Sequence, residues 1–132
     1  MVVAVDVGTV RVGVAASDPH RILASPVETV VAPGLQRVAD LVVEREAVLV
    51  VVGLPTSLSG RSDSASAQMA RDWAQELGHL VDVPVELVDE RLTTVTAAAA
   101  LRASGKRGKQ ARSVIDQAAA VALLQGVLDR RR

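Results

Sequence analysis

Cysteine, phenylalanine and tyrosine are absent from this 132-residue chain, and it contains a single tryptophan. Without cysteine, neither a disulfide framework nor a thiolate zinc site can form, which favours an intracellular protein. Without several exposed aromatic rings, bases have no platform on which to stack, which argues against single-strand binders of the OB-fold or RNA-recognition-motif kind. The core must therefore be built from valine, leucine and alanine.

The chain also has no excess of positive or negative charge and no long apolar segment. Lysine and arginine together number 15, and so do aspartate and glutamate, which gives a formal net charge of zero. The longest aliphatic run, 47–52, is far shorter than the ~20 residues that a membrane span needs. Because 49% of the residues are hydrophobic, the composition predicts one compact domain over residues 1–132. We expect a cytoplasmic protein without a signal peptide or a membrane partner.

Patterns of apolar residues predict an ordered series of strands and helices. Three β-branched segments come first and predict antiparallel strands over 2–6, 11–17 and 22–31. After them the patterns predict a helix over 34–46, a buried strand over 47–54, a helix over 63–80, a strand over 84–89, and helices over 94–103 and 113–129. This order predicts an α/β fold with a five-stranded mixed sheet, three antiparallel strands and then two parallel ones, and helices on both faces.

The first strand carries a carboxylate, Asp6, among valine, alanine and glycine residues. An ionised aspartate in an apolar core costs several kcal/mol unless a cation, a metal or strong hydrogen-bond donors compensate its charge. One interpretation is that the backbone amides of the Gly8–Thr9 turn donate to Asp6. The other is that a second segment or a metal ion brings positive charge to it.

Three further acids lie at the ends of predicted elements. Asp89 and Glu90 end the last strand, and because strand side chains alternate between faces, only one of them can face Asp6 without a bend. Asp116 falls in the first turn of the last helix, where Ser113 and Asp116 also have the spacing of a capping box. Taken singly, each of these acids has a purely structural interpretation as a strand-end or capping residue.

Taken together, the acids predict a metal centre. Parallel strands and a helix packed over their ends can bring Asp6, one strand-end acid and Asp116 around oxygen-preferring ions such as Mg²⁺ or Mn²⁺. Two such ions roughly 4 Å apart support phosphodiester hydrolysis without a covalent nucleophile. The histidines, His20 and His79, lack metal-ligand spacing, and we expect them in a turn and at a helix end.

One stretch, 104–112, combines two glycines and four basic residues with no apolar periodicity. This composition is typical of a mobile basic loop, and a solvated surface without a ligand is the simpler interpretation. Because the loop leads toward Asp116, we expect it to contact phosphates of a nucleic acid, in a salt-dependent manner and without reading base sequence. The side chains concerned are Lys106, Arg107, Lys109 and Arg112.

Five motifs spread along the whole chain form a set. They are, in order, Asp6–Ala15, Ser17–Pro19, Gly53–Pro55 with Gly60, Asp89–Thr94, and Val114–Ala120 with Leu123–Gln125. In this order and at this chain length, the set closely resembles the YqgF (RuvX) family. The resemblance implies an RNase H-like fold related to the RuvC resolvases. It also implies metal-dependent phosphodiester hydrolysis, either in maturation of the 5′ end of pre-16S rRNA or on Holliday junctions.

Carried over position by position, the resemblance implies that Asp6, Glu90 and Asp116 are the catalytic metal ligands. It also implies that Arg91 holds the scissile phosphate or pairs with a carboxylate, and that Arg11 contacts a neighbouring phosphate. The implied cofactor is Mg²⁺ or Mn²⁺ at a two-metal site, and the implied partner is precursor rRNA or branched DNA.

The chain departs from the family pattern just before its last acid. Members often carry lysine where this chain has Arg112 and Ser113, so the departure concerns the phosphate contact rather than the chemistry. The resemblance leaves the oligomeric state open, because a symmetric resolvase needs a two-fold dimer whereas an RNA-end nuclease can act as a monomer.

Two other classes of protein compete with this interpretation. The Asp6–Thr9 segment also resembles the first phosphate loop of sugar kinases and actin-like ATPases, but those proteins bury the nucleotide between two domains, and this chain has the length of one. The second competitor is a catalytically silent nucleic-acid-binding protein on the same fold.

Overall fold

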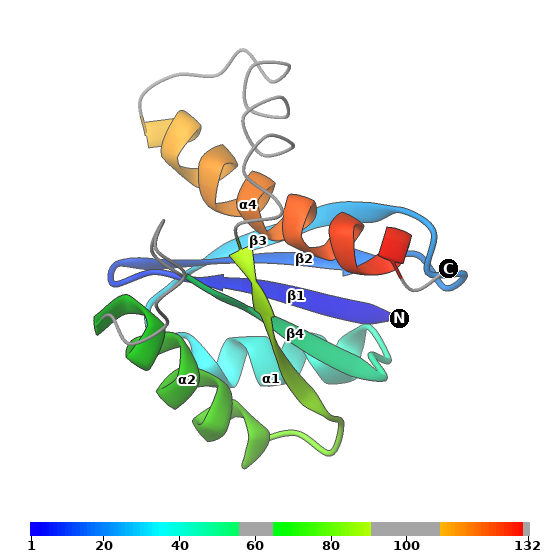
Figure 1. Ribbon diagram of the computed structural model, residues 1–132, viewed down its shortest axis with the longest axis horizontal. Coiled ribbons are helices and arrows are strands. Elements are labelled where there is room, and N and C mark those ends of the chain that lie inside the picture. Colours follow the sequence, from blue (N-terminus) through cyan, green and yellow to red (C-terminus); the bar gives the residue numbers. More distant parts are fainter. Residues whose placement is uncertain (56–64, 91–108, 131–132) are drawn as a thin grey trace.

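The structure is a computed structural model that describes residues 1–55, 65–90 and 109–130, except for the side chains of 109–116. Its centre is a five-stranded sheet with the order β3-β2-β1-β4-β5 (Figure 1). The first three strands pair antiparallel, and β4 and β5 continue the sheet in parallel. This arrangement confirms the predicted mixed sheet. The strands are β1 (Val2–Val7), β2 (Arg11–Ser17), β3 (Ala24–Val31), β4 (Leu49–Leu54) and β5 (Val85–Asp89).

Helices cover both faces of the sheet, as predicted. The helices α1 (Leu35–Glu44) and α2 (Ala65–Gly78) lie on one face, and α4 (Lys109–Arg130) crosses the other face over β1, β2 and β3 (Figure 1). Among the described helices, none combines the length and apolarity of a membrane span. The helix predicted over 94–103 lies outside the described residues.

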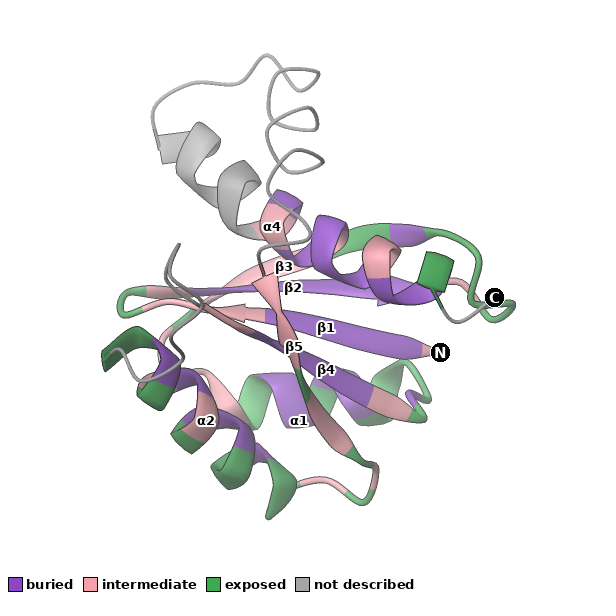
Figure 2. Cartoon of the chain, in the orientation of Figure 1, coloured by how far each residue is buried: buried purple, intermediate pink, exposed green. Residues whose placement is uncertain are grey.

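Alternation of side chains along β1 divides the apolar core into two layers. Val3 and Val5 pack in the layer that includes α1 and α2. Val2 and Ala4 pack in the layer formed with α4. Figure 2 shows the central strands as mostly buried between these layers. Because successive strand side chains alternate between faces, Asp6 leaves the sheet on the α4 side.

The third strand begins at Ala24, two residues later than the sequence predicts. The carboxylate of Asp18 explains the delay, because it accepts hydrogen bonds from the backbone N–H groups of Ile22 at 2.7 Å and Leu23 at 2.9 Å. It also accepts one from His20 at 3.3 Å. These bonds close a turn that contains His20 and postpone strand pairing.

The last helix begins at Lys109 rather than at Ser113. The final four residues of the predicted basic loop, 109–112, are therefore helical, which suits Lys, Gln, Ala and Arg as strong helix formers. Ser113 stands inside the helix and cannot be its N-cap. The capping-box interpretation of Asp116 is consequently wrong.

Gly8 sits at the tip of the first hairpin and cannot accept a side chain in place. We expect Gly8→Ala to destabilise the protein by roughly 1–3 kcal/mol, because the added methyl would lie 2.6 Å from the backbone carbonyl oxygen of Arg11. Gly78→Ala is the matched control, since among the described residues nothing outside its own helix lies within 4 Å of such a methyl. Urea denaturation measures both variants, and equal midpoints would contradict this account.

Candidate active site

The space around Asp6 is bordered by glycine on both neighbouring strands. On β2 its register partner is Gly13. On β4 the pairing of Val5 with Val52 brings Gly53 alongside Asp6, on the same face of the sheet. With glycine on each side, no neighbouring side chain fills the space over the carboxylate within its own row of the sheet.

Glu90 occupies part of this space. It follows β5 and leaves the sheet on the same face as Val88, which packs in the α4 layer. A methyl group built on Gly53 would lie 2.5 Å from Oε1 and 2.9 Å from Cγ of Glu90, so the glutamate side chain lies directly over Gly53. From there the Glu90 carboxyl group forms a hydrogen bond with the Asp6 side chain.

The choice between the two strand-end acids therefore falls on Glu90. Asp89 is the register partner of Leu54 and belongs to the alternate set of β5 positions, which leaves the opposite face of the sheet. It remains near enough to act on Glu90 through its charge.

Burial and the contact with Asp6 change the protonation of Glu90. Desolvation, the hydrogen bond with Asp6 and the charges of Asp6 and Asp89 together raise the pKa of Glu90 to about 8. The raised pKa favours the protonated form of Glu90, which supplies a hydroxyl for the hydrogen bond with Asp6. The turn interpretation of Asp6 is wrong for Gly8, whose N–H donates instead to the Arg11 carbonyl oxygen at 2.9 Å.

The third predicted acid, Asp116, is carried by α4 over the same end of the sheet. The next residue, Gln117, donates a hydrogen bond from Nε2 to Oγ1 of Thr29 at 3.0 Å. Thr29 pairs with Gly13, which pairs in turn with Asp6. The side chain of Asp116 lies outside the part of the chain that the structure describes.

Of the predicted phosphate-binding residues, the structure describes only one side chain. Arg11 begins β2 two positions before Gly13, so it leaves the sheet on the face of Asp6. The backbone of Lys109 and Arg112 lies in the first turn of α4. Arg91, Lys106 and Arg107 are outside the described residues.

The carboxyl pair is a donor set that fits Mg²⁺ or Mn²⁺. Both ions prefer carboxylate oxygens as ligands. Two carboxyl groups in contact repel each other when both are ionised, and a bound cation would relieve that repulsion. Among the described residues no three acidic or histidine side chains form a cluster. Two of the three predicted ligands therefore meet within the described part of the chain.

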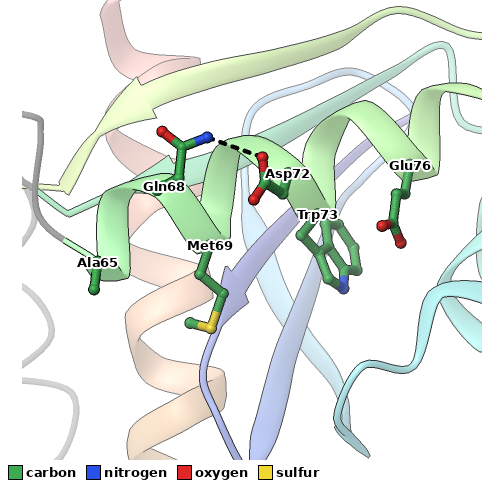
Figure 3. A pocket seen from close by; sticks show the side chains of 6 residues that line it. All are labelled: Ala65, Gln68, Met69, Asp72, Trp73 and Glu76. Carbon is green, nitrogen blue, oxygen red and sulfur yellow. Dashed lines mark hydrogen bonds between the residues drawn. The ribbon is translucent and has the colours of Figure 1, made fainter.

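A hollow on the other side of the molecule does not contribute to this pair. It lies along α2 and is lined by Gln68, Met69, Asp72 and Trp73 (Figure 3). Because α2 covers the opposite face of the sheet from α4, the hollow and the carboxyl pair are separated by the sheet.

Known proteins resemble this chain in both sequence and fold. The RuvX family, described as Holliday junction resolvase, matches residues 1–130. A protein of Rhodococcus opacus named "Putative pre-16S rRNA nuclease" is 55% identical over 138 residues, which cover 98% of this chain and 77% of that protein.

Solved structures with similar folds have much lower sequence identity. RuvC of T. thermophilus in complex with a Holliday junction substrate superposes with a TM-score of 0.62 at 16% identity, over 99% of this chain and 96% of that one. The Fowlpox virus resolvase in complex with Holliday junction DNA has a TM-score of 0.59 at 7% identity, over 98% and 97% of the two chains.

The mixed sheet with helices on both faces is thus the RNase H-like fold, and the class is that of nucleases, enzymes that hydrolyse phosphodiester bonds. Within that class, the chain belongs to the RuvX family.

The raised pKa of Glu90 makes the stability of the metal-free protein depend on pH. The pKa of Glu90 is near 4.5 in the unfolded chain and about 8 in the folded protein. At pH values between these two, the folded protein holds a proton that the unfolded chain has released. Glu90 therefore lowers stability as pH rises through this range, by at most about 1.4 kcal/mol per pH unit. Denaturation of wild type and Glu90→Gln between pH 4.5 and 8 should show a shallower fall for the variant, and parallel curves would count against it.

Proposed function

We propose that this protein is a metal-dependent endonuclease that matures the 5′ end of pre-16S rRNA. The single observation that carries the proposal is the contact of Asp6 and Glu90 over Gly53, which brings together two acids 84 positions apart in the chain. A structural role alone gives no reason to bury one carboxyl group against another, because the contact raises the free energy of the ionised pair.

In this proposal Asp6 and Glu90 hold the metal, and Asp116 completes the set of ligands. When bound, two divalent ions activate a water molecule and stabilise the leaving oxygen of the phosphodiester. Glu90 gives up its proton as the metal binds, so that both carboxyl groups are ionised. Gly53 leaves the space in which Glu90 reaches Asp6.

The substrate is held by positive charge beside the acids. Arg11 lies on the same face of the sheet as Asp6 and contacts a phosphate in this proposal. Arg91, next to Glu90 in the sequence, is proposed to contact a phosphate as well. Further phosphate contacts come from Lys106 and Arg107, which precede α4 in the chain, and from Lys109 and Arg112 in its first turn. Such contacts hold a backbone without selecting a sequence.

The name of the relative at 55% identity supports precursor rRNA as the substrate. The description of the family favours a second candidate, cleavage of Holliday junctions. The two activities make different demands on assembly, since symmetric junction cleavage needs two active sites related by a two-fold axis, whereas RNA-end processing works with one.

Substitution of Asp6 tests the proposed metal site. We expect Asp6→Asn to weaken Mn²⁺ binding at least ~100-fold in calorimetry, because a ligand that carries charge is lost. Asp72→Asn is the matched control, because that carboxylate lies on α2 behind the sheet, and it should bind Mn²⁺ as wild type does. Equal affinities in wild type and Asp6→Asn would support a silent nucleic-acid-binding protein instead.

Cleavage assays distinguish the two substrates. Wild type with Mn²⁺ should cut a fragment containing the 5′ end of pre-16S rRNA, and Glu90→Gln should bind the fragment without cutting it, because only the metal site is altered. A four-way DNA junction is assayed alongside. Cleavage of the junction with no cleavage of the rRNA fragment would replace the first candidate by the second.

Gly53→Ala tests whether the glycine is required for the carboxyl pair. The added methyl would displace Glu90 from its place beside Asp6, so Mn²⁺ affinity should fall about 10-fold or more while the fold is retained. Far-ultraviolet circular dichroism verifies folding and calorimetry measures affinity. Wild-type affinity in a folded Gly53→Ala protein would show that Glu90 reaches the metal from another position.

A further inference from the structure

Two glutamines attach α4 to the edge strand β3, one near each end of the contact. Gln117 bonds to Thr29, and Gln125 bonds to the backbone at Ile22 and Ala24. We infer that Gln117 and Gln125 are positioning residues that fix α4 along the sheet and so determine where Asp116 stands. This inference rests on the proposed metal site and deepens it.

The Gln125 side chain binds the start of β3 as a neighbouring strand would. Its Oε1 accepts a hydrogen bond from the backbone N–H of Ala24 at 2.9 Å, and its Nε2 donates to the carbonyl oxygen of Ile22, also at 2.9 Å. A third bond, from Nε2 to Oδ1 of Asp129 at 3.0 Å, orients the amide from within the helix. The side-chain amide of Gln125 is therefore fixed in both its orientation and its position relative to the start of β3.

The buried side chains of α4 that the structure describes are apolar, and their contact with the sheet has little directional preference. Hydrophobic burial holds the helix down, but it depends on area rather than on the axial position of the helix. Alanine forms the N-terminal part of this contact, and leucine and valine form the rest. The buried residues of this contact are Ala118, Ala120, Ala122, Leu123, Leu124, Val127 and Leu128.

Two bonded points fix what the apolar contact leaves free. Gln117 and Gln125 are eight residues apart, or about 12 Å along a helix axis, so together they oppose both sliding and tilting of α4. A slip of one helical turn would move position 116 by about 5.4 Å. Metal ligands must be placed within a few tenths of an ångström, so the register of α4 decides whether Asp116 can serve.

Gln125 separates a positioning role from direct contact. It lies nine residues beyond Asp116, about 13 Å along the helix, and its bonds go to the far end of β3 from Thr29. An effect of Gln125 on metal binding must therefore pass through the position of the helix.

Calorimetry with Mn²⁺ alone, on the full chain without nucleic acid, tests the inference. We expect Gln125→Ala and Gln117→Ala each to weaken Mn²⁺ affinity about 10-fold or more. Hydrogen exchange at the Ala24 amide should accelerate in Gln125→Ala, which shows directly that the bond to β3 is lost.

Val127→Ala is the matched control, because it removes apolar contact from the same helix without removing a hydrogen bond. It should lower the denaturation midpoint and leave Mn²⁺ affinity unchanged. Thr29→Val preserves side-chain shape and removes the hydroxyl that accepts the hydrogen bond from Gln117. Combined with Gln117→Ala, it should lower Mn²⁺ affinity no further than either change alone.

The possible results separate this inference from the proposed function. Wild-type affinity in a folded Gln125→Ala protein, together with weakened Mn²⁺ binding in Asp6→Asn, would overturn the positioning role alone. An equal loss of Mn²⁺ affinity in Val127→Ala would also overturn it, since general loosening of the helix would then suffice. If wild type and Asp6→Asn bind Mn²⁺ equally, the metal site and the positioning role are both rejected.

Discussion

The contact between Asp6 and Glu90 is the constraint around which this end of the molecule is built. It requires a parallel pairing of β1 with β4 and of β4 with β5, because only that order places the two acids on either side of Gly53. It also requires that β4 present no side chain between them, a condition that glycine alone meets. Burial, and then the contact with Asp6, raise the pKa of Glu90 to about 8, which favours the form that holds a proton. Binding of a divalent cation would replace that proton and turn an unfavourable contact into a ligand pair.

On the opposite face of the sheet, acidic side chains that are not part of the candidate site form ion pairs with an arginine. Arg37 of α1 pairs with Glu28 of β3 at 2.8 Å and with Glu44 at 3.1 Å. Hydrogen bonding to Arg37 holds the pKa of Glu28 below its usual range, so this acid stays ionised. These groups are partly exposed, and their contribution to stability is correspondingly small. The contrast is physical: around Glu28 the fold brings a cation to an acid, whereas at Glu90 it brings a second acid.

The sequence was sufficient to predict the sheet. The apolar runs at 2–6, 11–17 and 47–54 each have the length of a single strand, and the order of the elements allows few topologies. Helix ends were less predictable. The start of α4 at Lys109 depends on helix propensity that the two nearby glycines obscured. The acids were recognised as a set, but alternation alone could not decide between Asp89 and Glu90. That choice depends on which side chains of β5 lie on the α4 side of the sheet, which only the tertiary structure shows. Gln117 and Gln125 both fall in the last of the five motifs, but their contacts with β3 could not be predicted, since an amide on a helix is ordinarily a surface residue.

The two sides of the candidate site are built on different physical principles. Asp6 and Glu90 come from paired strands, where backbone hydrogen bonds fix the register and a slip of one residue would turn every side chain to the other face. Asp116 comes from a helix laid across the sheet, where burial of alanine and leucine specifies the axial position less sharply than a directional hydrogen bond does. A ligand set shared between these two layers is only as exact as the connection between them. Gln117 and Gln125 supply that connection through directional bonds to β3, and β3 is joined through β2 to the strand that carries Asp6. The hydrogen-bonded register of the sheet thus determines the position of the helix through two side-chain amides.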